Sequence, residues 1–296
     1  RPVARTNKPG TLPPGVPKAV ANAGVQVDPQ LLYWWFRLSG QSRDIKAGSY
    51  ELEAGITPRR LLAKLARGEA SLQAITLVEG WTFRQVRAAL ASDGGLRPDT
   101  RGLDDAAVMA LLGRPDVHPE GRFFPDTYTY AKGSSDVAVL RRALRAMDRR
   151  LEQAWAQRSP QAVVRTPEQA LILASIVEKE TGRAADRTLV SAVFNNRLRI
   201  GMPLQTDPTV IYGMGPAFNG NLRKIDLQTD TPWNTYTRPG LPPTPIAMPG
   251  KASLLAAVQP APSKALYFVP RGDGSSQFSE SLDEHNRAVN KFQRGR

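Results

Sequence analysis

The sequence predicts an α+β fold in two parts, a small module near the N-terminus and a larger mixed α/β domain after it. The chain has 296 residues, of which 41% are hydrophobic and 23% charged, which is enough for two domains with cores of their own. A pattern of strand, glycine turn and helix occurs twice, over residues 50–66 and 75–91. An apolar helical stretch at 167–180 marks the core of the larger domain.

The repeated pattern defines the small module. Its two copies align at an offset of 25 residues, which pairs Gly55 with Gly80. In each copy a threonine two residues after the glycine is the expected N-cap of an amphipathic helix. This order of elements in residues 18–70 resembles the LysM glycan-binding module, although an ordinary strand–helix unit fits the pattern equally well. Residues 1–17, rich in Pro, Gly and Lys, are expected to form a linker before it.

The charge of the chain restricts its partners. It has 40 Lys and Arg against 27 Asp and Glu, a net charge of +13, which suits nucleic acid, an anionic membrane surface or an anionic polymer such as cell wall. The arginines are scattered along predicted helices without interleaved aromatic residues, so we expect no nucleic-acid partner. No apolar run approaches the roughly 20 residues that span a bilayer.

The residue types present also exclude several chemistries. Cysteine is absent and there are two histidines, so the sequence offers no disulfide framework, thiolate metal site or cysteine nucleophile. It contains no phosphate-binding loop and no dinucleotide-binding fingerprint. We therefore expect neither a metal nor a cofactor, and we assign no role to His285, which falls on the predicted C-terminal helix.

The helix at 167–180 is the element on which we place the chemistry. Thr166 is its expected N-cap, Pro167 stands at its first position and Gln169 completes a capping box. Gly182 supplies a stop signal. Residues 171–177 are apolar or small on every face, so this helix is expected in the core.

Glu178 lies on the last turn of this apolar helix. Burial and the negative end of the helix dipole both favour the neutral form of its carboxyl group, which is the form a general acid needs. The alternative is a structural ion pair with one of three nearby cations, Lys179, Arg183 or Arg197. Glu180 lies about 200° around the helix from Glu178, so the two are not expected to act as a pair.

Six segments carry a specific resemblance to a known family. They are Ala174–Thr181, Phe194–Met202, Leu204–Gly215, Asn234–Tyr236, Gly240–Pro243 and Tyr267–Val269. In sequence and order they resemble the MltG (YceG-like) endolytic murein transglycosylases. The resemblance extends from the LysM-like region to the C-terminal helix and implies that residues 71–296 form a YceG-like catalytic domain.

The resemblance implies a specific reaction. The family cleaves the β-1,4 bond between N-acetylmuramic acid and N-acetylglucosamine in nascent peptidoglycan, leaves a 1,6-anhydro end and so sets glycan length. Its catalytic glutamate falls on Glu178. That residue would first protonate the glycosidic oxygen and then take the proton of the muramoyl 6-hydroxyl, so a second, nucleophilic carboxylate is not required.

Loop residues around Glu178 are candidates for substrate contacts. Gln205, Asp207 and Asn234 are expected either to hydrogen-bond acetamido and hydroxyl groups or to stabilise positive charge at the anomeric centre, and Tyr212 and Tyr236 to stack on sugar faces. The alternative for Asp207 is that it orients its loop through the following Pro208. Two further residues, beside Pro125, are expected either to form another wall of the cleft or to form a packed turn; these are Phe124 and Asp126.

The resemblance also implies a location and partners. Family members are held in the inner membrane by one N-terminal transmembrane helix, so we expect residues 1–17 to follow an anchor missing from this sequence, with this portion facing the periplasm. Peptidoglycan glycan strands are the expected substrate, and peptidoglycan synthases are expected partners. The alternative function is a non-catalytic peptidoglycan-binding scaffold for those synthases.

Overall fold

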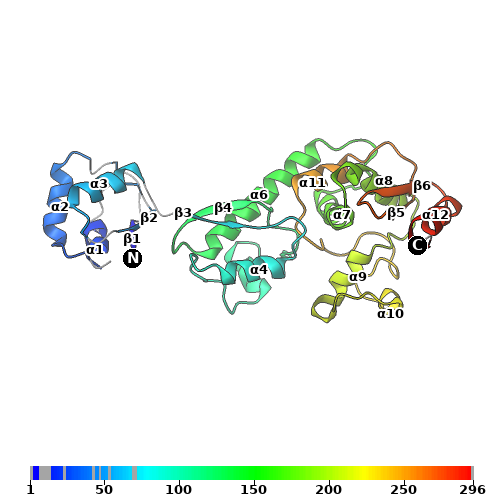
Figure 1. Ribbon diagram of the computed structural model, residues 1–296, viewed down its shortest axis with the longest axis horizontal. Helices are drawn as coiled ribbons and strands as arrows, with labels where there is room; N and C mark the ends of the chain where they lie inside the picture. Colours follow the sequence, from blue (N-terminus) through cyan, green and yellow to red (C-terminus); the bar gives the residue numbers. More distant parts are fainter. Residues whose placement is uncertain are drawn as a thin grey trace. The chain divides into compact units, whose positions relative to one another are not determined.

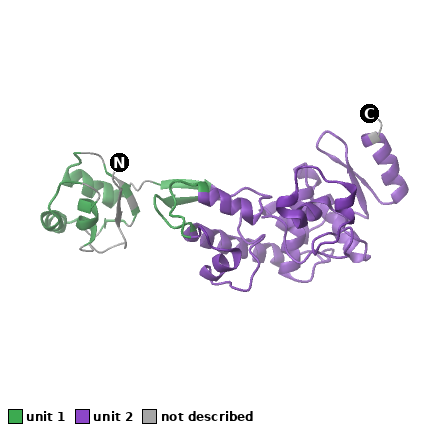
Figure 2. Cartoon of the chain, turned by 90° about the horizontal axis from the view of Figure 1, so that it is seen from below, with its two compact units in different colours: residues 1–75, 92–99, 128–136 green, residues 76–91, 100–127, 137–296 purple. Residues whose placement is uncertain are grey.

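The computed structural model describes residues 3–6, 15–22, 25–41, 44–46, 48–52, 55–68 and 72–294. They form two compact units, which Figure 2 distinguishes by colour. The first unit comprises Arg1–Ile75, Ser92–Asp99 and Tyr128–Asp136, and the second comprises Thr76–Ala91, Thr100–Thr127 and Val137–Arg296. Both are built from helices and two-stranded sheets, as the mixed composition predicted.

The N-terminal part of the first unit packs helices against a two-stranded antiparallel sheet. Strand β1 pairs with β2 in a register that sets Val3 opposite Glu51. The elements in chain order are β1 (Val3–Thr6), α1 (Gly15–Asn22), α2 (Pro29–Leu38), β2 (Gly48–Glu51) and α3 (Pro58–Arg67). Their shared core includes Val20, Phe36, Tyr50 and Leu65. Of the expected linker, residues 1–2 and 7–14 lie outside the described residues, whereas Val3–Thr6 form β1 and residues 15–17 begin α1, so the described part of 1–17 belongs to this unit.

Both expected threonine N-caps are confirmed. The Oγ1 atom of Thr57 accepts a hydrogen bond from the backbone N–H of Arg60 at the start of α3. Thr82 and Gln85 form a reciprocal capping box before α4 (Phe83–Ser92). Gly55 and Gly80 both have φ near +79°, a left-handed conformation that favours glycine at each turn. The first unit also contains most of β3 (Leu72–Thr76) and β4 (Thr127–Ala131), which pair with one another.

The second unit is organised around helix α7 (Pro167–Glu180), the apolar helix that the sequence singled out. Every residue from Ala170 to Val177 is buried, and α7 packs against α8 and α11 (Figure 1). Its other elements are α5 (Asp105–Leu111), α6 (Asp136–Ala156), α8 (Arg187–Arg199), α9 (Asp207–Met214), α10 (Lys224–Gln228), α11 (Lys251–Val258), β5 (Tyr267–Pro270), β6 (Ser276–Ser279) and α12 (Leu282–Val289).

The ends of α7 follow their expected signals with two differences. Thr166 accepts from the N–H of Gln169, but the Gln169 side chain accepts from the N–H of Arg165, one residue before the N-cap. The helix ends at Glu180, before the Gly182 stop signal, because the backbone of its C-cap residue Thr181 is extended; the N–H and the hydroxyl of Thr181 both donate to the carbonyl of Val177. Within the described ranges, no helix is both long enough and apolar enough to cross a membrane.

The core around α7 generates a stability prediction. Leu173 is fully buried in the cluster that surrounds this helix, so Leu173→Ala is expected to lower the free energy of unfolding by about 2–5 kcal/mol through lost burial and a residual cavity. Leu111→Ala is the matched control, because Leu111 is 48% exposed and its truncation leaves no comparable cavity. Urea denaturation of both variants measures the difference. Equal losses would mean that α7 is not a packing centre.

Candidate active site

Helix α7 places Glu178 at the beginning of a second helix. Glu178 is half-buried, and its Oε2 atom accepts a hydrogen bond of 2.9 Å from the backbone N–H of Gly250. Gly250 is the N-cap residue of α11, whose first turn presents unpaired N–H groups and the positive end of its dipole. The negative C-terminal end of α7 is thus opposed by the positive N-terminal end of α11 at this carboxyl group.

The ion-pair alternative for Glu178 is not supported. The Lys179 ammonium group instead reaches the carbonyl oxygen of Gly80 at 3.4 Å. The guanidinium group of Arg197 donates to backbone carbonyls, including that of Leu204 at 2.7 Å. Over the described part of the chain, no cationic side chain lies within ion-pair distance of the Glu178 carboxyl group. Its polar partner is the backbone of α11.

A second carboxyl group, that of Glu79, lies beside Glu178. Glu79 follows β3 in the loop that leads to α4, and a Cβ atom built on Gly250 would meet its Oε1 atom at 1.9 Å. The residue as a whole is exposed, yet desolvation of its carboxyl group and the charge of Glu178 raise its pKa, against the opposing effect of Arg187. The sequence analysis missed Glu79. The two copies of the repeat differ at this position, where the first copy has Ala54. That difference was the signal for Glu79 available in the sequence.

The polar residues beyond α7 form a separate cluster around Glu180. The hydroxyl group of Thr206 donates to Glu180, and desolvation by burial raises the pKa of this carboxyl group. Asp207 accepts a 2.6 Å hydrogen bond from the hydroxyl of Tyr236. Gln205, whose side chain is exposed, has a φ of 51°, the only positive value at a non-glycine residue in the described ranges. These candidate residues therefore gather near Glu180, on a different side of α7 from Glu178.

Two other candidates are buried. Asn234 has no exposed surface, and its amide donates to the carbonyls of Leu227 and Thr229 at 3.0 and 2.7 Å. Its oxygen accepts from the N–H of Tyr236, so all of its hydrogen-bonding capacity shapes the loop. Phe124 is 7% exposed and packs in the core around α7. Of the two interpretations of its segment, the packed turn is the one observed.

Tyr212 belongs to a buried network that the sequence analysis did not find. Its hydroxyl group hydrogen-bonds the carboxyl group of Glu120, which is 3% exposed, and its ring packs edge-on against Trp233 at 5.5 Å. Glu120 also accepts from the N–H of Phe83 at 2.9 Å. Burial outweighs these hydrogen bonds and raises the pKa of Glu120 to about 7. Asp126, by contrast, is exposed and accepts from the N–H of Thr127, the next residue.

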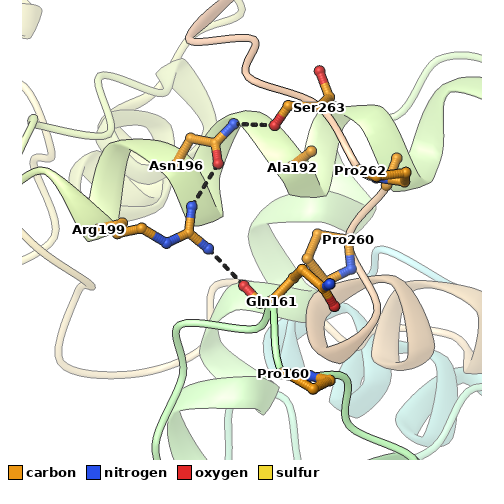
Figure 3. Close-up of a pocket in the computed structure, with 9 residues that line it drawn as sticks. Pro160, Gln161, Ala192, Asn196, Arg199, Pro260, Pro262 and Ser263 are labelled. Carbon is orange, nitrogen blue, oxygen red and sulfur yellow. Dashed lines mark hydrogen bonds between the residues drawn. The ribbon is translucent and has the colours of Figure 1, made fainter.

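A pocket of about 320 Å³ lies elsewhere in the second unit (Figure 3). Three prolines line it, and its one ionisable side chain, Arg199, is bound to the side chain of Asn196 and the carbonyl of Gln161. Neither Glu178 nor Glu79 lines this pocket. In the described ranges, no three His, Cys, Asp or Glu side chains cluster closely enough to hold a metal ion. Glu178 and Glu79 remain the two neighbouring carboxyl groups at the start of α11.

A carboxyl group held at a helix terminus beside a second carboxyl group is an arrangement typical of enzymes that cleave glycosidic bonds. Comparison with known proteins gives the family. The model of the YceG-like family matches residues 8–291, nearly the whole chain, and this chain belongs to that family.

Relatives of known name are similar over most of this chain. The endolytic murein transglycosylase of Bacillus subtilis (strain 168) is 33% identical over 264 residues, which cover 83% of this chain and 73% of the relative. The endolytic murein transglycosylase of Streptococcus pneumoniae serotype 2 is 29% identical over 282 residues, and the match spans half of its length. The crystal structure of a YceG-like protein from Listeria monocytogenes aligns with a TM-score of 0.62 at 25% identity, covering 97% of this chain and 98% of that one.

The buried Glu120 makes the stability of the protein depend on pH. Its pKa is raised from 4.5 to about 7 in the folded state, so its stabilising contribution is fully present below about pH 4.5 and is lost as pH rises through 7. We expect the unaltered protein to lose up to about 3 kcal/mol of stability from this group between pH 5 and pH 8. Glu120→Gln should remove that loss.

Urea denaturation at pH 5, 6.5 and 8 measures this effect. Glu152→Gln is the control, because Glu152 is exposed on α6. Parallel stability curves for the unaltered protein and Glu120→Gln would contradict the assignment.

Proposed function

We propose that this protein is an endolytic murein transglycosylase that cleaves the β-1,4 bond between N-acetylmuramic acid and N-acetylglucosamine within glycan strands and leaves 1,6-anhydro ends. Membership of the YceG-like family and the names of its relatives support this activity. The observation that carries the mechanism is the hydrogen bond from Gly250 to Glu178, because it gives the proposed acid a defined position and a donor for its ionised form.

In the first step Glu178 donates its proton to the glycosidic oxygen while the bond from that oxygen to the anomeric carbon breaks. The glucosamine side leaves as a free hydroxyl, and Glu178 becomes a carboxylate. The N–H of Gly250 stabilises this carboxylate, because hydrogen bonds to ionised acceptors are stronger than those to neutral ones. The start of α11 thus favours the charge that appears as the leaving group departs.

In the second step the muramoyl 6-hydroxyl oxygen forms a bond to the anomeric carbon. Its proton passes to Glu178, which returns to the acid form. No water is consumed, so the product has the mass of the hydrolysis product less one water. A single side chain serves as acid and then as base.

The candidate substrate contacts divide by exposure. Gln205 and Asp207 are exposed and Tyr236 is half-buried, so we retain these three as residues that contact sugar hydroxyl or acetamido groups. Asn234 and Tyr212 are proposed to shape the loops that carry them, since their polar atoms are already bonded. Asp126 stays a candidate for the edge of the site.

Three further properties are proposals that follow from the family. Residues 18–70 act as a LysM-like glycan-binding module, which the capped turn at Gly55 and Thr57 supports. The described portion works on the periplasmic side of an inner membrane, held by an anchor preceding residues 1–17. Its partners are glycan strands and the synthases that make them, and residues 71–296 form the catalytic domain.

Replacement of the proposed acid tests the function. Glu178→Gln keeps the shape and the hydrogen bond to Gly250 but has no proton to donate, so we expect turnover to be abolished with stability changed by about 1 kcal/mol or less. Uncrosslinked nascent peptidoglycan is incubated with each protein, and the products are identified by mass spectrometry. Glu152→Gln is the control, since that carboxyl group is remote from the site.

Anhydro-ended products from the unaltered protein and from Glu152→Gln alone would support the proposal. Reducing ends would indicate hydrolysis. Intact polymer that still binds all three proteins would favour the non-catalytic scaffold instead.

A further inference from the structure

The backbone next to Glu79 is held by hydrogen bonds to two other segments of the second unit. The N–H of Gly80 donates to the carbonyl of Met248 at 2.8 Å, and the N–H of Met248 donates to the carbonyl of Trp81 at 2.7 Å. Lys179 adds a third contact, from its ammonium group to the carbonyl of Gly80. The loop that carries Glu79 is therefore joined both to the segment before α11 and to the last turn of α7. The Cα atom of Glu79 is thereby held close to Gly250 and to the end of α7.

Gly250 separates the two carboxyl groups. Its N–H is 2.9 Å from Oε2 of Glu178, and a Cβ atom on it would lie 1.9 Å from Oε1 of Glu79. Within one residue, the backbone N and Cβ atoms are separated by a fixed covalent distance. The sum of that distance and the two distances above gives an upper limit of about 7 Å between the carboxyl oxygens of Glu178 and Glu79. Glycan-cleaving enzymes place their two carboxyl groups from about 5 to 9.5 Å apart, so an upper limit of about 7 Å leaves this pair close enough to act on one glycosidic bond. Glycine at 250 permits this spacing, because any side chain there would displace Glu79.

The charge around Glu79 is not neutralised by an ion pair. The positive charge of Arg187 lowers the pKa of Glu79. In the described ranges, however, no Lys or Arg lies within 4 Å of the carboxyl oxygens of Glu79. Two neighbouring carboxyl groups repel one another when both are ionised. This repulsion destabilises the folded protein unless a bound ligand offsets it. Positive charge that develops on a bound sugar would offset this repulsion.

We propose that Glu79 is the second functional carboxyl group of this site, and that its carboxylate stabilises the positive charge that develops at the anomeric carbon while Glu178 carries out both proton transfers. Glu79 forms no covalent bond and transfers no proton, so the atom balance of the reaction is unchanged. This inference rests on the proposed transglycosylase function.

The test compares Glu79→Gln, Glu79→Asp, Glu178→Gln and Glu152→Gln with the unaltered protein on uncrosslinked peptidoglycan. For Glu79→Gln we expect kcat to fall about 100-fold or more, as for loss of one electrostatic stabiliser, with KM changed less than about threefold and anhydro ends retained. Glu79→Asp keeps the charge and should recover at least about tenfold of that loss. The acidic limb of the pH–rate profile should change in Glu79→Gln, because Glu79 acts only when ionised, its pKa is raised by desolvation and by the charge of Glu178, and the variant has no carboxyl group to ionise.

Several results would overturn the inference. They are a kcat for Glu79→Gln within about twofold of the unaltered protein, a loss confined to KM, or equal losses in Glu79→Gln and Glu79→Asp without movement of the pH profile. Failure of the proposed function has a different signature, since the unaltered protein would then form no anhydro ends. Thermal unfolding of each variant identifies any loss that comes from misfolding.

Discussion

The hydrogen bond between the start of α11 and the end of α7 is the interaction on which the site depends. It links Gly250 to Glu178 and holds a carboxyl group where the positive end of one helix meets the negative end of another. The packing of α7 against α11, through residues that are apolar on every face of α7, fixes the distance between these helix ends. Ser175 adds a second link, because its hydroxyl accepts from the N–H of Ile246 four residues before Gly250. The core and the chemistry are thus parts of one arrangement.

The last turn of α7 serves two groups of residues. Glu178 faces Gly250 and the loop of Glu79, whereas Glu180 is hydrogen-bonded to Thr206. The rotation of about 200° between positions two residues apart on a helix accounts for this separation. The Glu178 side offers carboxyl groups for bond cleavage, and the Glu180 side carries the loop with Gln205, Asp207 and Tyr236. A glycan strand long enough to contact both would be oriented by one side and cleaved at the other.

Local sequence signals predicted local structure well. The threonine caps at Thr57, Thr82 and Thr166 and the burial of α7 are all confirmed, because each depends on residues three or four apart. Ser281 caps α12 in the same way, because its hydroxyl accepts from the N–H of Glu284. The position of Glu178 near one end of a buried helix was readable for the same reason. The sequence did not predict that Glu178 is half-exposed or that its partner lies on α11, since 72 residues separate Glu178 from Gly250.

The same distance in sequence explains the other differences. Glu79 reaches Glu178 across about a hundred residues, and Glu120 reaches Tyr212 across a similar interval, so neither pairing leaves a local pattern. Asn234 is polar and lies in a loop, which suggested a ligand contact, yet its amide is consumed by three backbone groups of its own loop. Whether a polar loop residue contacts a ligand or its own loop depends on tertiary hydrogen bonds, which a local sequence pattern does not show.

The proposed mechanism depends above all on Glu178 as the group that acts on the glycosidic oxygen. The most direct measurement is a crystal structure of Glu178→Gln with a bound peptidoglycan oligosaccharide spanning the cleaved bond. The account predicts that the side chain at 178 lies within about 3.2 Å of the glycosidic oxygen, with the Glu79 carboxyl group on the side of the anomeric carbon. A well-ordered glycan bound away from residue 178, for example in the pocket beside Arg199, would contradict it.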